Sequence, residues 1–152
     1  MTTKFRAVNE IDISPLFQTP NHQSSIVDAQ IAQALVTDGA FVATGLKDSS
    51  SLDQKMYALS LNDGTKLWEY SAGGGITSQA LVDDGRLYFG SFDSTFVALD
   101  AVTGTPLWTF DGASSWYWAA PIKFGESIYA SSMDGGIYML DARQGQLRWH
   151  FD

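Results

Sequence analysis

The chain of 152 residues contains no cysteine and only 2 histidines. Without cysteine there can be no disulfide bond, no thiolate metal ligand and no cysteine nucleophile, although this absence does not identify a cellular compartment. His22 lies in an irregular stretch and His150 stands beside a tryptophan, so neither suggests a catalytic triad. No dense loop of oxygen ligands for calcium is evident either. The sequence therefore indicates no catalytic residue and no metal site, which favours a non-enzymatic protein over an enzyme.

Basic residues and long apolar runs are also scarce. Only 9 Lys and Arg stand against 17 Asp and Glu, and the net charge of -8 repels nucleic acid phosphates and anionic lipids. No apolar stretch approaches the roughly 20 residues that a membrane-spanning helix needs, and the first residues lack the apolar core of a secretory signal. We therefore expect neither a nucleic acid partner nor membrane insertion. A cytoplasmic location follows if Met1 is native, and an extracytoplasmic one if the chain was excised from a longer precursor.

The sequence is rich in aromatic residues, and some of them recur with a fixed period. It contains 5 Trp, 6 Tyr and 9 Phe with 45% hydrophobic residues, a composition typical of a packed protein. Trp108 follows Trp68 by 40 residues, and Trp149 follows Trp108 by 41. Repetition at this period is the first evidence to weigh, because it determines the architecture.

Each repeat contains four short apolar or aromatic runs separated by turn residues, the pattern of four strands. Four strands in about 40 residues indicate a blade of a β-propeller rather than a helical repeat. The composition of 28–35 is helix-like, but its second half aligns with 79–81 and is expected to be a strand. We thus predict an all-β fold, a partial β-propeller of three four-stranded antiparallel blades at 30–71, 77–111 and 118–152. Residues 1–29 are expected to be irregular, with one possible strand at 4–8.

Several residues of the repeat have a structural explanation. A large tryptophan ring near the end of a unit can pack between neighbouring blades and donate a hydrogen bond. A glycine four residues earlier suits a hairpin with positive φ. These positions form the expected structural motif of the blades: Trp68, Trp108, Trp149, Gly64, Gly104, Gly145, Asp100 and Asp141.

The run at 98–108 reads Ala98-Leu99-Asp100-Ala101-Val102-Thr103-Gly104-Thr105-Pro106-Leu107-Trp108. It resembles the tryptophan-docking motif of the pyrroloquinoline-quinone-like (quinoprotein-type) repeat family. The first copy departs from this pattern at Ser60 and Asp63, and the third at Met139 and Gln144. The resemblance covers about residues 30–152 and implies a propeller, but fold alone does not imply function.

The resemblance leaves two activities open. Blades of this type occur in quinone-dependent alcohol dehydrogenases and in non-enzymatic propellers such as outer-membrane assembly lipoproteins and sensor domains. The enzymes hold pyrroloquinoline quinone with calcium, and many stack the quinone on a disulfide that this chain cannot form. We therefore expect no cofactor, with pyrroloquinoline quinone plus calcium as the alternative. The expected function is a non-catalytic propeller module for binding a protein or a small ligand, and the alternative is a fragment of a quinone-dependent dehydrogenase.

Three blades would leave both ends of a ring exposed, since propellers usually close with about four to eight. An exposed blade face is a large apolar patch, and such patches mark association surfaces. We therefore expect the ring to be completed by self-association into a homo-oligomer or by the remaining blades of a longer parent chain. A purely structural assembly unit, whose only partner is itself, is a further possibility.

Candidate binding residues lie where the connections between blades meet the hairpins between second and third strands. Trp116-Tyr117-Trp118 stands out there, because we align it with Gly74-Gly75-Ile76 in the preceding unit. Strand alternation predicts that Trp116 and Trp118 point one way and Tyr117 the other. These aromatic rings could form a stacking platform for a sugar, peptide or planar ligand, or simply fill the channel mouth or an interface. The candidate site comprises Trp116, Tyr117, Trp118, Phe92 and Met133.

Overall fold

The computed structural model describes the backbone of residues 30–37, 40–48, 51–60 and 62–152, and side chains from residue 54 onward within these ranges. The described residues form three four-stranded sheets, in each of which strands adjacent in sequence pair antiparallel. The expected all-β, antiparallel fold is thus confirmed for this part of the chain. Within it we find no helix that could serve as a membrane-spanning segment. The predicted irregular region 1–29, with its possible strand at 4–8, lies outside the described residues.

The strands follow one another in sequence order. The first sheet contains β1 Gln30–Thr37, β2 Ala40–Asp48, β3 Ser51–Ser60 and β4 Lys66–Ser71. The second contains β5 Leu81–Asp83, β6 Arg86–Gly90, β7 Phe96–Asp100 and β8 Pro106–Phe110. The third contains β9 Ile122–Phe124, β10 Ser127–Ser131, β11 Ile137–Asp141 and β12 Leu147–Phe151. Strand β1 pairs with β2 in the segment of helix-like composition, so repeat alignment was the better guide there.

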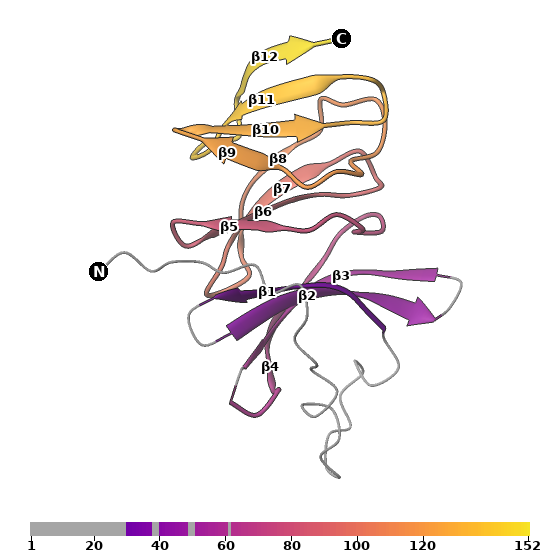
Figure 1. Cartoon of the computed structure of the whole chain (residues 1–152), viewed down its shortest axis with the longest axis vertical. Coiled ribbons are helices and arrows are strands. Elements are labelled where there is room, and N and C mark those ends of the chain that lie inside the picture. Colours follow the sequence, from indigo (N-terminus) through magenta and orange to yellow (C-terminus); the bar gives the residue numbers. More distant parts are fainter. Residues whose placement is uncertain (1–29, 38–39, 49–50, 61) are drawn as a thin grey trace.

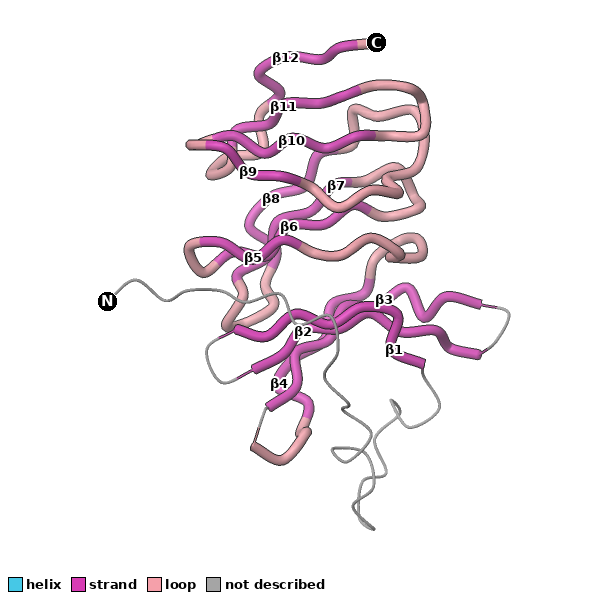
Figure 2. Tube along the Cα trace, in the orientation of Figure 1, coloured by secondary structure: helices cyan, strands magenta, loops and turns pink. Residues whose placement is uncertain are grey.

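The three sheets are stacked one on another, with the first at the bottom of Figure 1 and the third at the top. Their connections lie at two opposite ends. In the second and third sheets, the hairpins between second and third strands lie at the right of Figure 2, as do the β4–β5 and β8–β9 connections, and the other turns of these two sheets lie at the left. We call the right-hand end of the second and third sheets the loop face. It consists of residues 72–80, 91–95, 111–121 and 132–136.

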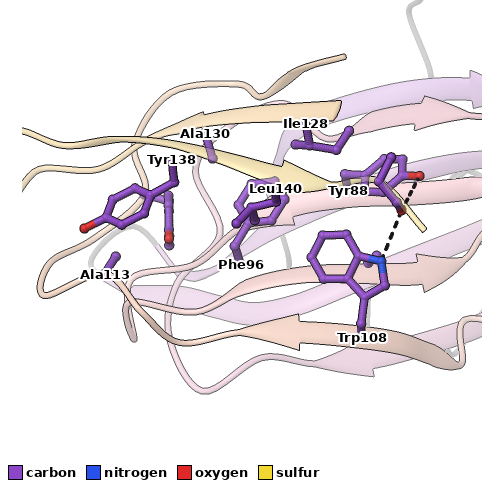
Figure 3. Packing of buried hydrophobic residues seen from close by; sticks show 11 residues of the cluster. Tyr88, Phe96, Trp108, Ala113, Ile128, Ala130, Tyr138 and Leu140 are labelled. Atoms are coloured by element: carbon purple, nitrogen blue, oxygen red, sulfur yellow. Dashed lines mark hydrogen bonds between the residues drawn. The ribbon is translucent and has the colours of Figure 1, made fainter. Parts of the chain in front are cut away.

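Two apolar clusters fill the spaces between the sheets. The first joins residues such as Met56 and Trp68 of the first sheet to Leu87 and Phe89 of the second. The second cluster, shown in Figure 3, joins the opposite face of the second sheet to the third. Because side chains alternate along a strand, Leu87 and Phe89 face one neighbour while Tyr88 faces the other. The second sheet is therefore buried on both faces.

The same tryptophan contact occurs at both interfaces. The indole Nε1 of Trp68 donates to the Ala101 carbonyl at 3.2 Å, and that of Trp108 donates to the Ala142 carbonyl at 3.1 Å. Each indole also lies against a glycine of the next sheet. A Cβ added to Gly104 or Gly145 would stand 2.5 Å from the Cδ2 of the ring. Since φ is +71° at Gly104 and +70° at Gly145, these positions require glycine for both conformation and space.

The turns that carry these glycines are held by a carboxylate. Asp100 Oδ1 accepts the backbone N–H groups of Val102 and Thr103 at 3.0 and 2.8 Å. The backbone hydrogen bond from Thr103 is the main reason why the pKa of Asp100 lies below its usual value. Asp141 receives the equivalent backbone hydrogen bonds in the third sheet, and the Arg148 guanidinium is the largest cause of its lowered pKa. Both aspartates therefore fix the glycine turn against which the preceding sheet packs.

Candidate binding face

Four of the five predicted binding residues come together at the loop face. Phe92 belongs to the β6–β7 hairpin, Trp116 and Trp118 to the β8–β9 connection, and Met133 to the β10–β11 hairpin. The Phe92 ring stacks with both indoles, with its centroid 5.1 Å from that of Trp116 and 5.5 Å from that of Trp118. The Met133 N–H donates to the Trp116 carbonyl at 2.8 Å. The sequence named these residues, and the structure brings them into one group, which we call the aromatic stack (Phe92, Trp116 and Trp118) with Met133 beside it.

The two indoles of the aromatic stack are exposed, and Phe92 between them is partly buried. Trp116 is 50% and Trp118 58% exposed, and Met133 is 63% exposed. Tyr117, between the two tryptophans, is only 1% exposed, so the expected alternation along 116–118 is confirmed. An isolated antiparallel bridge between Tyr117 and Ser132 explains the extended backbone that produces this alternation. Trp116 and Trp118 therefore flank a buried residue while remaining exposed themselves. Packing within the described residues does not explain this exposure.

Tyr117 itself belongs to the core and does not share the exposed face with the other candidates. Its ring contacts Phe96 edge-on at 5.3 Å and Tyr138 at 6.3 Å between centroids. The close approach to β6 requires a glycine, because a Cβ on Gly90 would stand 2.1 Å from the Tyr117 Cβ. Burial raises the pKa of the Tyr117 hydroxyl, which has no hydrogen-bond partner among the described residues. We therefore assign Tyr117 to anchoring the connection.

The structure also corrects our alignment of this connection with the preceding one. The Phe92 N–H donates to the Gly75 carbonyl at 2.9 Å, just as the Met133 N–H donates to that of Trp116. Trp116 therefore corresponds to Gly75, and Tyr117 to Ile76, which is also 1% exposed. The pattern Gly74-Gly75-Ile76 was placed one residue too early. The one-residue error could not be seen from the sequence, because consecutive glycines provide no pattern of side chains to align.

Each hairpin at the loop face is tied to the preceding connection by an aspartate. In the second sheet, Asp93 Oδ1 accepts from the N–H of Thr95 at 3.1 Å and from its hydroxyl at 2.6 Å. Burial raises the pKa of Asp93, but hydrogen bonds from Thr95 and from the backbone of Gly73 outweigh it, so the pKa lies below its usual value. A Cβ on Gly73 would stand 2.2 Å from Asp93 Oδ2, which shows how closely the two segments approach.

Asp134 has the corresponding place in the third sheet. Its Oδ1 accepts from the Gly136 N–H at 2.9 Å, and its Oδ2 from the Ser114 N–H at 2.9 Å and the Tyr138 hydroxyl at 2.7 Å. Burial raises the pKa of Asp134, yet these hydrogen bonds hold it well below its usual range. Burial together with the bond to Asp134 raises the pKa of Tyr138 to about 12. The carboxylate is therefore charged and structurally engaged at neutral pH.

Sequence reasoning had not recognised this pair of aspartates as links between segments. The available signal was a repeated Ser-x-Asp, at 91–93 and 132–134, which places both aspartates in the same hairpin position. Among the residues whose side chains are described, no group of three or more His, Asp or Glu could hold a metal ion. What the loop face offers is therefore an exposed aromatic stack beside carboxylates that are already hydrogen-bonded.

Comparison with known proteins gives a consistent family assignment. A family model described as outer membrane protein assembly factor BamB matches residues 20–152. The quinoprotein ethanol dehydrogenase of Pseudomonas putida is 32% identical over 107 residues, covering 57% of this chain and 16% of that protein. The outer membrane protein assembly factor BamB of Kangiella koreensis is 29% identical over 97 residues, covering 62% of this chain and 24% of that protein.

The structural comparison agrees with the all-β architecture. The crystal structure of BamB from Moraxella catarrhalis superimposes with a TM-score of 0.65 at 23% identity, covering 78% of this chain and 34% of that one. At this level of identity the likeness concerns the fold. The chain spans only 16% to 24% of the length of the two curated relatives described above.

Proposed function

We propose that this chain, which belongs to the PQQ-like repeat family described as outer membrane protein assembly factor BamB, is a non-catalytic β-propeller module that binds a protein through its loop face. The single observation that carries the proposal is the aromatic stack of Phe92, Trp116 and Trp118, in which both indoles are about half exposed. Tryptophan is enriched at protein interfaces, and exposed apolar groups gathered in one place mark binding surfaces. The name "assembly factor", printed for one relative and for the matching family model, supports a protein partner.

Packing does not account for the two tryptophans. The preceding connection makes the same backbone contact with Gly75 in place of Trp116 and buries Ile76 in place of Tyr117. One residue further on, Trp118 stands where that connection has Thr77. The buried position thus stays apolar in both connections, while the positions on either side of it differ. Gly75 is buried and Thr77 is partly buried, whereas Trp116 and Trp118 are about half exposed. A large side chain that the fold does not need at these positions supports a role in binding.

The exposed apolar area of the two indoles is large enough to contribute several kcal/mol to binding. A tryptophan side chain buries about 150–250 Å² when covered, so two half-exposed indoles leave roughly 200 Å² to be buried. At about 25 cal/mol per Å² this corresponds to about 5 kcal/mol before the cost of association. The stack is therefore able to act as the centre of a binding surface, with the polar loops as its rim.

We further propose that the three sheets are three propeller blades and that a further blade covers the third. Trp149 occupies the position of Trp68 and Trp108, yet it is 44% exposed whereas each of those is 9% exposed. Ile122, Ile137 and Phe151 are also exposed on this sheet. The further blade comes from self-association into a homo-oligomer or from a longer parent chain. Multi-angle light scattering over a range of concentrations tests the first, and a monomer at every concentration would argue against it.

A second candidate is a fragment of a quinone-dependent dehydrogenase, which the identity to quinoprotein ethanol dehydrogenase favours. The described residues do not fit its cofactor well, since they contain neither the cysteine pair that many such enzymes use nor a group of acidic residues able to hold calcium. Calorimetric titration with pyrroloquinoline quinone plus calcium separates the candidates. Tight binding together with dye-linked alcohol oxidation would refute the non-catalytic module.

Site-specific photocrosslinking tests the binding function directly. A photoreactive residue in place of Met133 should form a crosslink to a discrete protein in an extract of the source cells. The same residue in place of Val102, which is 79% exposed in a turn at the opposite end, serves as the control. The crosslink at Met133 should disappear when Trp116→Gly and Trp118→Thr reproduce the preceding connection. Equal crosslinking from Met133 and Val102, or persistence in the double variant, would contradict the proposal.

A further inference from the structure

The loop face carries charge of one sign. Its four segments contain three aspartates, Asp93, Asp111 and Asp134, and no lysine or arginine. Two of the aspartates are held in place by backbone hydrogen bonds, which favour the charged carboxylate. The negative charge at this end is therefore fixed in position at neutral pH rather than carried by flexible side chains.

The basic residues of the second and third sheets lie toward the other end. Arg86 begins β6 and donates to the Ala142 carbonyl at 3.1 Å. Arg143 lies in the β11–β12 turn and pairs with Glu126 at 3.1 Å, while Arg148 pairs with Asp141 at 2.5 Å. Lys123, the fourth of these residues, pairs with Asp83. In these two sheets the cations are thus separated from the loop face and engaged with partners of their own.

The aromatic stack stands within this negative field. Phe92 contacts both indoles, and each indole remains about half exposed. The face of an indole attracts cations, arginine more often than lysine, because the ring carries negative electrostatic potential above its plane. A guanidinium can stack on an indole and pair with a carboxylate at the same time. The combination of exposed indoles and fixed carboxylates, in segments that contain no lysine or arginine, is complementary to arginine.

We propose that the loop face binds an arginine- and lysine-bearing segment of a protein partner, with guanidinium groups over Trp116 and Trp118 and within the field of the neighbouring aspartates. This inference rests on the proposed function and specifies the chemistry of the partner. A purely apolar partner would gain nothing from the separation of charge between the two ends. Nucleic acid is repelled by the same carboxylates.

A short synthetic peptide provides the probe. We would titrate the chain with a peptide of alternating glycine and arginine, and in parallel with its glycine–glutamate counterpart and with spermidine, by calorimetry and tryptophan fluorescence. The arginine peptide should bind in a saturable manner, and its affinity should fall as salt rises from about 0.02 M to about 0.3 M, because the charges are exposed and screened. Binding of the glutamate peptide, or equal binding of spermidine, would overturn the inference.

Matched variants locate the binding. Trp116→Ala and Trp118→Ala should each weaken the arginine peptide about two- to fivefold, the range for an exposed cation–π contact. Asp111→Asn should weaken it at low salt and have little effect at high salt. Asp84→Asn and Val102→Ala, at the opposite end, should leave binding unchanged. Asp93 and Asp134 are left intact, because their hydrogen bonds hold the loops together.

The outcomes separate this inference from the proposed function. If the indole variants do not weaken the arginine peptide, or the control variants weaken it equally, the inference fails. A partner crosslinked at Met133 without any binding of the arginine peptide would leave the binding module standing and refute its cationic specificity. Far-UV circular dichroism and urea denaturation of each variant establish that the folded structure is retained, as expected for exposed positions.

Discussion

Replacement of Gly145 by alanine tests how closely neighbouring sheets pack. The position has φ +70°, and an added Cβ would stand 2.5 Å from the Cδ2 of Trp108. Gly85 offers a matched control, since it has φ +71° but nothing within 4 Å of an added Cβ. Both substitutions incur the conformational cost of a left-handed alanine, about 1–2 kcal/mol. Only the substitution at Gly145 also forces the Trp108 ring away from its neighbour.

The additional cost follows from the contact. Overpacking of this kind costs about 1–3 kcal/mol, and displacement of the indole weakens the hydrogen bond from Trp108 to the Ala142 carbonyl, which contributes about 1 kcal/mol. We therefore expect Gly145→Ala to lower the free energy of unfolding by about 4 kcal/mol and Gly85→Ala by about 1–2 kcal/mol. The difference corresponds to a midpoint roughly 5–10 °C lower for the variant at Gly145.

Urea denaturation followed by far-UV circular dichroism measures both variants without relying on tryptophan emission. A double-mutant cycle sharpens the test, because in a Trp108→Ala background the clash is gone and Gly145→Ala should cost only as much as Gly85→Ala. The reasoning would be refuted by equal costs at Gly145 and Gly85 in the wild-type background, or by an unchanged cost at Gly145 in the absence of the indole.

Three further predictions follow from the same contacts. Trp108→Ala should lower the free energy of unfolding by about 4 kcal/mol and Trp149→Ala by at most about 2 kcal/mol, as measured by urea denaturation. Of these two indoles, only that of Trp108 is buried and hydrogen-bonded to the next sheet. Equal losses of stability would contradict this reasoning. Because the pKa of Asp134 is lowered in the folded state, its carboxylate stabilises the fold fully above about pH 4 and loses this effect as the pH falls further. The melting temperature of Asp134→Asn should therefore fall less below pH 4 than that of the wild type. A parallel decline of both would show that the carboxylate contributes no pH-dependent stability. Gly90→Ala should displace Tyr117 and change the near-UV circular dichroism, whereas an unchanged spectrum would argue against the close contact.

The repeated features of the fold were the predictable ones. The spacing of Trp68, Trp108 and Trp149 predicted three similar units, because stacked sheets impose the same contact at each interface. The four strands of each unit could be expected from the turn residues between the apolar runs. Repeat alignment even predicted the strand at β1 against its helix-like composition. These positions recur in the sequence because each sheet makes the same packing contact with the next sheet.

Features that depend on a neighbour could not be predicted in the same way. The three repeat tryptophans look alike in sequence, yet Trp149 is far more exposed than the other two. The stacking of Phe92 with Trp116 and Trp118 arises where a hairpin of one repeat meets the connection to the next, so no local pattern encodes it. The alignment error at Gly75 has the same origin, because only the backbone hydrogen bond reveals the correspondence.

The contrast between the two connections separates packing from function within one chain. Both connections accept a hydrogen bond from the following hairpin, both bury an apolar residue at the corresponding position, and both approach an aspartate of that hairpin. These shared features are what the stack of sheets requires. The positions on either side of the buried anchor differ, because the chain carries the half-exposed Trp116 and Trp118 where the first connection has the buried Gly75 and the partly buried Thr77. Since the first connection shows that the fold does without them, the two tryptophans remain available for the protein partner proposed above.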